Sequence, residues 1–263
     1  MLSDLHNKEF SLSLSGGGAL GLSHLGVLSV LEEKNLLPSE ILGTSMGAII
    51  GALYAIGLKE SEITSIVDKF GAIKKWVKLS LKGNAIVDTT KIETIFKEVF
   101  GDMSFKDTKI PLKIITTKLD NSKRVVFSKE NNIKLVDALL ATMAIPGIFN
   151  EKVIDGDIYV DGFLSENLPL TDTKYNTILA VDVLGKNSFN RELPDNIFKT
   201  SNVFDMFEKS LRTLIYNQTQ KNIECLSDKE IILIEPKTEG FSTYQFNKLK
   251  KLRKKGLKAT LKV

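Results

Sequence analysis

The chain has 263 residues, of which 43% are hydrophobic and 26% charged, with a formal net charge of +4 at pH 7. This is an ordinary globular composition, and the length is sufficient for one large α/β domain with a buried core. The first nine residues lack the apolar centre of a secretory signal, and the longest apolar run, residues 48–58, is too short to cross a bilayer. One cysteine excludes an internal disulfide, and histidine and cysteine do not cluster at metal-ligand spacing. We therefore expect a cytoplasmic protein without a metal or other cofactor.

The first predicted strand is the alternating run 10–14, which ends in the sequence Ser15-Gly16-Gly17-Gly18-Ala19 just before a helical pattern of leucines. Successive glycines at a strand-to-helix junction expose several backbone N–H groups on one turn, and such a turn binds anions. A flexible linker is one alternative, although linkers do not usually separate a patterned strand from an amphipathic helix. A nucleotide-binding loop is another, but neither common nucleotide motif is complete here.

The second strand-to-helix junction is Gly43-Thr44-Ser45-Met46-Gly47, between the apolar pair at 41–42 and the helical pattern at 48–56. A serine two residues from a glycine on each side is the sequence form of a nucleophile elbow. The sharp turn strains the backbone at the serine and brings neighbouring chain segments close, so the flanking positions need glycine. The alternative is that Ser45 only caps the following helix.

The middle of the chain continues as alternating helices and strands. Helices are predicted at 60–70, at 91–100 after a cap at Asp88 or Thr89, and at 133–144, where Pro146 and Gly147 end the helix. Strands are predicted at 112–117 and 125–128, joined by a polar turn. Residues 73–81 mix lysines with large apolar side chains and are expected to form either an acyl-chain entrance or a layer that covers the core.

Asp161 follows a tight turn at 154–157 and two apolar residues, and it precedes Gly162. The carboxylate is therefore expected at a strand end beside an open loop, although aspartate at such a place is often only a turn former. The sequence contains only His6 and His24. His24 lies about two predicted helical turns beyond the glycine loop, too far to meet a serine there. If Ser45 is a nucleophile, a carboxylate must be its base.

The last third of the chain is predicted to hold a central parallel strand at 177–183, a helix at 203–223 and a strand at 231–234. Asp182, near the end of the first of these, is the rival to Asp161 for the role of base. Cys225 is expected to be a small buried residue of the helix. Strands that alternate with helices predict a three-layer α/β/α sandwich with a mainly parallel central sheet and a site at the carboxyl ends of the strands.

Four segments in fixed order resemble the patatin-like phospholipase family: SGGGALG at 15–21, GTSMGAIIGALYAIG at 43–57, PGIFNEKV at 146–153 and YVDGFLSENLP at 159–169. The resemblance extends from about residue 10 to residue 183, and it implies a patatin-like domain over residues 1–263 that hydrolyses acyl esters of lipids. It further implies a dyad of Ser45 as nucleophile and Asp161 as base. The resemblance assigns the oxyanion hole to the N–H groups of Gly17 and Gly18, with Gly16 or Ala19.

Two residues depart from the family pattern. Leu20 stands where the glycine loop of the family usually has Arg or Lys, and Phe163 stands where Asp-Gly is usually followed by Gly or Ala. The first departure removes a cation beside the loop, so we expect neutral or single-chain esters to be preferred over anionic phospholipids. The second narrows the space beside Asp161.

Three functions are considered for this arrangement. The first is a serine hydrolase acting on lipid esters. The second is an acyltransferase on a related sandwich, although such enzymes usually supply a histidine base. The third is a catalytically weak binding module that is recruited to membranes. Labelling by a fluorophosphonate separates the third from the other two, and product analysis with an added acceptor separates the first two.

The tail at 244–263 is predicted to be a basic helix, because eight basic residues and no acidic residue lie between Lys248 and Lys262. Nucleic acid is not an expected partner, since no binding motif accompanies the charge. The tail is either a solvated helix face or a peripheral contact with an anionic membrane. In the second case four leucines are expected to enter the interface: Leu249, Leu252, Leu257 and Leu261.

Overall fold

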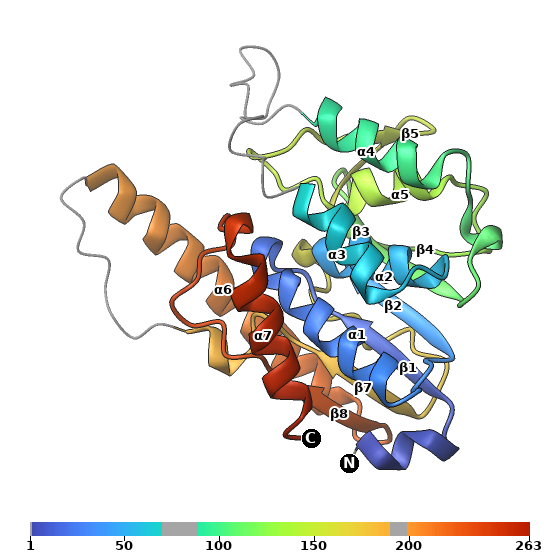
Figure 1. Ribbon diagram of the computed structural model, residues 1–263. Coiled ribbons are helices and arrows are strands. Elements are labelled where there is room, and N and C mark those ends of the chain that lie inside the picture. Colours follow the sequence, from blue (N-terminus) through green and yellow to red (C-terminus); the bar gives the residue numbers. More distant parts are fainter. Residues whose placement is uncertain (1, 70–88, 190–198) are drawn as a thin grey trace.

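The computed structural model describes residues 2–69, 89–189 and 199–263 (Figure 1). In this part of the chain the strands form one eight-stranded sheet in the order β5-β6-β3-β2-β1-β7-β8, with β4 also paired to β3. The strands are β1 (Phe10–Leu14), β2 (Glu40–Thr44), β3 (Leu112–Lys118), β4 (Lys123–Phe127), β5 (Lys152–Ile154), β6 (Asp157–Asp161), β7 (Thr177–Val181) and β8 (Glu230–Ile234).

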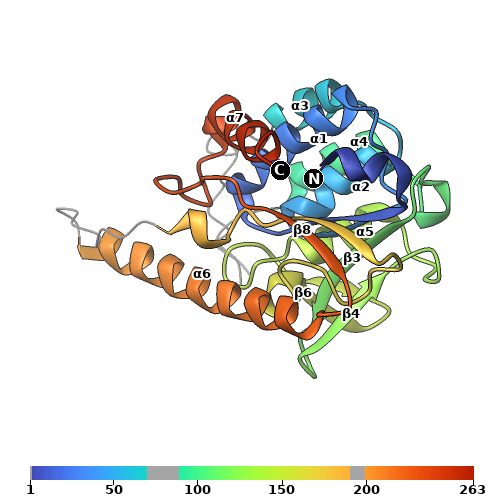
Figure 2. The same cartoon turned by 90° about the horizontal axis from the view of Figure 1, so that it is seen from below.

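The helices lie on both sides of this sheet. They are α1 (Ser23–Glu33), α2 (Met46–Ala55), α3 (Glu60–Asp68), α4 (Thr90–Phe100), α5 (Leu135–Thr142), α6 (Lys199–Cys225) and α7 (Leu249–Thr260). Figure 2 shows α1, α2, α3 and α7 on one side of the sheet and α6 running along the other. The predicted three-layer α/β fold with a mainly parallel sheet is confirmed. Within the described residues, none of the helices combines the length and the apolar character needed to cross a membrane.

The centre of the sheet is parallel: β3, β2, β1, β7 and β8 pair in the same direction. Every residue of β1, β2 and β7 is buried, as expected for strands that are covered on both faces. Because these strands point the same way, the loops that follow β1, β2 and β7 meet at one edge. The β6 strand is antiparallel to β3, and its last residue, Asp161, pairs with Thr116.

The basic tail does form a helix, α7, but it is part of the folded body. Its backbone crosses α1 at two glycines: a Cβ on Gly26 would lie 2.0 Å from the carbonyl oxygen of Arg253, and one on Gly256 would lie 1.8 Å from that of Ser23. Leu249 and Leu252 are buried in the core, and Arg253 pairs with Glu60 of α3 (Nε to Oε1, 2.8 Å). The expectation that these two leucines enter a membrane is therefore wrong, because the protein core already covers them.

Other differences from the predicted elements are small. The α6 helix is longer than the predicted 203–223, and Cys225 at its end is exposed, so its prediction as a buried residue is wrong. The 133–144 helix begins two residues later, at Leu135. The irregular segment 73–81 lies outside the described residues.

Candidate active site

Ser45 sits at the turn from β2 into α2 with backbone angles φ 53° and ψ −122°. A positive φ is strained for a residue with a side chain, and it persists only where the surroundings fix it. Here the N–H of Ser45 donates to Thr142 Oγ1 at 2.9 Å. Close packing also explains the flanking glycines: a Cβ on Gly43 would lie 2.5 Å from Ala48 Cα, and one on Gly47 would lie 2.3 Å from the carbonyl oxygen of Leu14.

Asp161 lies at the end of β6 and contacts Ser45 directly. Ser45 Oγ donates to Asp161 Oδ2 at 2.7 Å, and the N–H of Phe163 donates to Oδ1 at 3.0 Å. The main chain of Asp161 is held on both sides, because its N–H donates to the carbonyl of Ala144 at 2.9 Å and its carbonyl accepts from Thr117 Oγ1 at 3.1 Å. The two residues are 116 positions apart in the sequence, so this contact is made by the fold.

The Asp161 carboxyl is fully buried, and burial raises its pKa from 3.8 to about 7. The hydrogen bonds from Phe163 N–H and Ser45 Oγ oppose the shift, since they favour the charged form. Among the described residues, no charged side chain contributes to this shift. A carboxylate whose pKa is near neutrality is a better proton acceptor for a serine hydroxyl than an ordinary surface aspartate.

The glycine loop after β1 continues into a short 3₁₀ helix, η2 (Gly18–Leu22), beside Ser45. The N–H of Gly16 donates to the carbonyl of Asn167 at 3.1 Å, and the N–H of Ala19 donates to the carbonyl of Thr243 at 2.7 Å. Among the described residues, no acceptor takes the N–H of Gly17 or of Gly18. Of the four residues named from the sequence, only these two therefore have an N–H left for a ligand.

Gly18 shows why this loop needs glycine. Its φ is +53°, and a Cβ there would lie 2.4 Å from the carbonyl oxygen of Thr243. The segment before α7 thus packs directly against the loop, and it places Phe246 near Ser45 as well. Sequence analysis did not predict this contact, because residues 241–246 lie far from the glycines in the chain and carry no motif that links the two segments.

An apolar cleft opens at Ser45. It is lined by Gly18, Ser45, Met46, Ile49, Ile92, Met143, Ile145, Phe149 and Phe246, which come from η2, α2, α4, the segment after α5 and the segment before α7. None of these described lining residues carries a charge. Such a cleft suits a hydrocarbon chain next to the serine.

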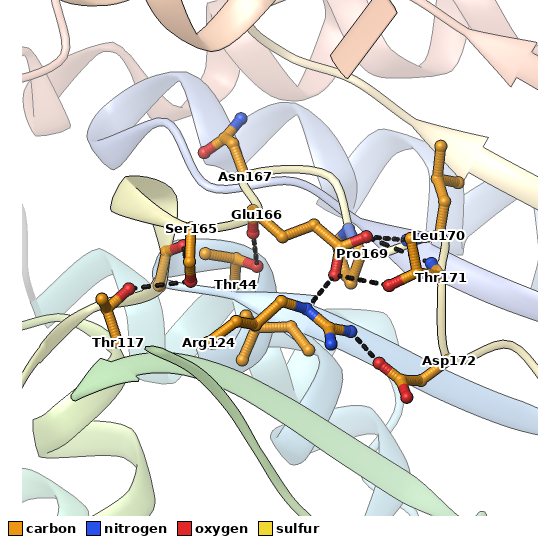
Figure 3. A network of polar contacts seen from close by, with 12 residues as sticks. Thr44, Thr117, Arg124, Ser165, Glu166, Asn167, Pro169, Leu170, Thr171 and Asp172 are labelled. Carbon is orange, nitrogen blue, oxygen red and sulfur yellow. Dashed lines mark hydrogen bonds and ion pairs between the residues drawn. The ribbon is translucent and has the colours of Figure 1, made fainter. Parts of the chain in front are cut away.

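The segment after Asp161 is fixed by a network that sequence analysis missed (Figure 3). Glu166 is 1% exposed, and its carboxylate pairs with Arg124 of β4 and accepts the N–H groups of Leu170 at 2.9 Å and Thr171 at 3.1 Å. The main-chain carbonyl of Glu166 accepts a hydrogen bond from Thr44 Oγ1 at 2.9 Å, and Thr44 immediately precedes Ser45. The network therefore ties the segment after Asp161 to the strand that delivers Ser45.

His24 does not contact Ser45, as expected, but the reason is different from the predicted one. The 3₁₀ helix η2 intervenes, so His24 lies in the first turn of α1, beneath the glycine loop. Its Nε2 is 2.9 Å from the carbonyl oxygen of Ser15, and burial lowers its pKa to about 4, so the ring is neutral. His6 lies in the exposed part of η1 (Leu2–Asn7).

Asp182, the rival carboxylate, lies just after β7 on the other side of the glycine loop. It is buried, its Oδ1 accepts the N–H of Leu184 at 3.0 Å, and no hydrogen bond joins it to Ser45 among the described residues. Burial, together with the negative charge of Glu235, raises its pKa to about 7. The pKa is therefore raised in both Asp161 and Asp182, so the pKa does not distinguish the two candidate bases. The hydrogen bond to Ser45 does, because Asp161 forms it.

Of the two departures from the family pattern, Leu20 is fully buried and Phe163 is partly buried against the core. The Leu20 side chain is therefore enclosed by the protein and not open to a ligand. The expectation that Leu20 sets a preference for neutral esters therefore loses its basis, because an Arg in its place would be a buried cation.

The family model for patatin-like phospholipases matches residues 12–174, more than half of the chain. The chain therefore belongs to the patatin-like phospholipase family. The matched residues include the glycine loop, Ser45 and Asp161, but not β7, β8, α6 or α7.

Among curated relatives, Lysophospholipase NTE1 of Candida glabrata is 28% identical over 282 residues, which is 96% of this chain and 16% of the relative. Lysophospholipase NTE1 of Saccharomyces cerevisiae is 30% identical over 193 residues, 68% of this chain and 11% of the relative. An uncharacterized NTE family protein of Mycobacterium tuberculosis is 29% identical over 163 residues, 61% of this chain and 44% of the relative. The chain thus spans less than half the length of each.

Among solved structures, VipD from Legionella pneumophila superposes with a TM-score of 0.56 at 14% identity, over 97% of this chain and 66% of that one. This similarity shows a shared fold.

Proposed function

We propose that this chain is a serine hydrolase that cleaves acyl esters of lipids, with Ser45 as nucleophile and Asp161 as base. The observation that carries the proposal is the 2.7 Å hydrogen bond from Ser45 Oγ to a buried carboxylate, at the mouth of an apolar cleft. Membership of the patatin-like phospholipase family supports it.

In the first step, Asp161 accepts the Ser45 proton while Oγ attacks the ester carbonyl carbon. The carbonyl oxygen becomes an oxyanion, which accepts hydrogen bonds from the free N–H groups of Gly17 and Gly18. When the intermediate collapses, the ester C–O bond breaks and the proton passes from Asp161 to the leaving alcohol. Water then attacks the acyl carbon and gives a proton to Asp161. When this second intermediate collapses, the bond from the acyl carbon to Ser45 Oγ breaks, the proton passes from Asp161 to Ser45 Oγ, and the fatty acid leaves.

The cleft supports a substrate with an acyl chain, since its lining is apolar and begins at the nucleophile. The curated relatives are named lysophospholipases. We therefore propose lysophospholipids, which carry one acyl chain, as the substrate class. A panel of lysophospholipids, diacyl phospholipids, acylglycerols and aryl esters tests this: lysophospholipids should have the highest kcat/KM, and a stronger preference for diacyl lipids would contradict it.

The test of the hydrolase itself has two parts. A fluorophosphonate should label the native chain but not Ser45→Ala, and incubation of a lipid ester with an added alcohol should release mainly free fatty acid. Absence of labelling would favour a binding module. Transfer of most of the acyl group to the alcohol would favour an acyltransferase.

We also propose that α7 is a peripheral contact with anionic membranes. Five exposed lysines lie on one side of α7 or just after its end: Lys250, Lys251, Lys254, Lys258 and Lys262. Within the described residues, none of them forms an ion pair. The opposite side of α7 packs on α1, so the lysines face away from the core. Each Lys near an anionic bilayer contributes about 1 kcal/mol, and the attraction is screened by salt.

The substitution of three lysines, Lys250→Gln, Lys254→Gln and Lys258→Gln, tests this contact without removing α7. Binding to vesicles that contain an anionic lipid should weaken at least tenfold, while hydrolysis of a soluble ester stays unchanged. The matched control makes the same charge change at three exposed lysines elsewhere: Lys106, Lys123 and Lys129. Equal loss of vesicle binding in both variants would show that only net charge matters.

A further inference from the structure

Asn167 holds a buried side-chain amide for which the described part of the chain supplies no partner. The residue is 1% exposed, and neither Nδ2 nor Oδ1 makes a hydrogen bond within the described chain. A buried amide without partners costs stability, because its hydration is lost and nothing replaces it. Such groups are uncommon in native proteins, and a catalytic role is one reason for keeping one.

The main chain of Asn167, in contrast, is fully engaged. Its N–H donates to Gln218 Oε1 at 3.2 Å, and its carbonyl accepts the N–H of Gly16 at 3.1 Å. These two bonds fix the position of the residue against the glycine loop. In Figure 3 the amide points away from the Arg124–Glu166 network, although Glu166 is its neighbour in sequence.

The amide lies at the junction of the glycine loop and the nucleophile. The position that a Cβ on Gly16 would occupy is 2.6 Å from Asn167 Oδ1 and 3.2 Å from Ser45 Cβ. Gly16 thus leaves space that the Asn167 side chain fills, and this brings the amide beside the serine. The two unpaired N–H groups of Gly17 and Gly18 follow directly in the same loop.

We propose that Asn167 contacts the substrate as a third hydrogen-bond donor to the ester carbonyl oxygen, beside Gly17 and Gly18; this rests on the hydrolase function proposed above. The two ends of an amide exchange places by a half-turn about the last side-chain bond. Since neither end is bound by a described residue, a carbonyl oxygen in the site selects the orientation that presents Nδ2–H. The contact strengthens as negative charge develops on that oxygen, so it acts mainly on kcat.

The test is Asn167→Leu, which keeps the number of side-chain heavy atoms and the branch at Cγ but removes the amide. Because no protein hydrogen bond is lost, the melting temperature should stay the same or rise. Because a donor to the oxyanion is lost, kcat/KM on a soluble aryl ester should fall about 100-fold, mostly in kcat. Asn167→Asp should lose at least as much at pH 8, since a carboxylate repels the oxyanion.

Asn187→Leu is the matched control. Asn187 Nδ2 donates to the carbonyl of Glu235 at 3.0 Å, so this change removes an amide that has a protein partner. It should lower the melting temperature and leave kcat/KM within twofold of the native value.

Native protein and Ser45→Ala are measured alongside. Native hydrolysis that is abolished in Ser45→Ala, combined with an Asn167→Leu variant within threefold of native kcat/KM, overturns only the role of Asn167. A lower melting temperature with a parallel loss of activity in Asn167→Leu also overturns it, because this is what a structural amide would show. If native protein is inactive, or Ser45→Ala is as active, the hydrolase proposal itself fails.

Discussion

The pKa of Asp161 leads to a prediction that joins activity and stability. Burial raises this pKa to about 7, whereas an aspartate in the unfolded chain has a pKa of about 3.9. Only the ionised carboxylate accepts the Ser45 proton. The kcat/KM for a soluble aryl ester should therefore fall about tenfold per pH unit below 7, and at pH 5 it should be about 1% of its plateau.

Stability should change in the opposite direction. Between pH 4 and pH 7 the folded state binds a proton at Asp161 that the unfolded state has released, so stability falls as pH rises through this window. From pH 5 to pH 8 the raised pKa of Asp161 should lower the free energy of unfolding by about 2–3 kcal/mol. Asp161→Asn has no charge to bury. It should be inactive, but between pH 5 and pH 8 it should gain up to that amount of unfolding free energy relative to the native protein.

Urea unfolding at pH 5 and pH 8 and a kcat/KM profile from pH 5 to pH 9 measure both effects. The control is Asp182→Asn, which removes a carboxyl whose pKa is raised for the same main reason. It should show a similar stability gain at high pH but keep the native pH profile of kcat/KM. A native profile that is flat from pH 5 to pH 8, or an Asp161→Asn variant with more than a tenth of native activity, would refute the reasoning.

Three further predictions follow from the same geometry. Ser45→Ala should lower ester hydrolysis by about 10³-fold or more, because the covalent route is lost, and activity within tenfold of native would remove Ser45 from the mechanism. His24→Asn should lower the melting temperature and keep at least a third of native kcat/KM, since among the described residues the ring bonds only to the carbonyl of Ser15; a folded but inactive variant would contradict this. Leu20→Arg should destabilise the protein by several kcal/mol in urea unfolding rather than change head-group preference, because position 20 is fully buried, and an unchanged unfolding midpoint would count against that view.

The parts of the site that could be predicted from the sequence are those encoded locally. The glycine loop and the Ser45 turn each join a strand to a helix, and the glycine spacing reflects steric needs that act within a few residues: Gly43 faces Ala48, and the loop at Gly18 adopts a positive φ. The pairing of Ser45 with Asp161 could not be predicted from a local pattern of this kind. Its prediction depended on the absence of a suitable histidine and on the order of four family motifs, and the structure places the two side chains in contact.

The parts that could not be predicted are made by irregular segments that meet over long distances in the chain. The carbonyl of Thr243 fixes Ala19, and the Asn167 carbonyl fixes Gly16, so two of the four N–H groups named from the sequence are occupied. Every residue has a backbone carbonyl, so the residue types in a sequence do not indicate which carbonyl accepts a given N–H. The same holds for the ion pair of Arg124 with Glu166, since each residue alone is compatible with an exposed loop.

The position of α7 changes how the tail relates to the site. A basic helix at the end of a chain suggests an appendage, but Gly26 and Gly256 let α7 and α1 touch through their backbones, and the ion pair of Arg253 with Glu60 fixes α7 to α3. The residues just before α7 then cover the glycine loop at Thr243 and line the cleft at Phe246. Removing the tail would therefore remove one wall of the site together with its lysines. Loss of vesicle binding after truncation could therefore not be assigned to charge. For this reason the test substitutes only lysines on the exposed side of α7 and leaves the side that packs on α1 intact.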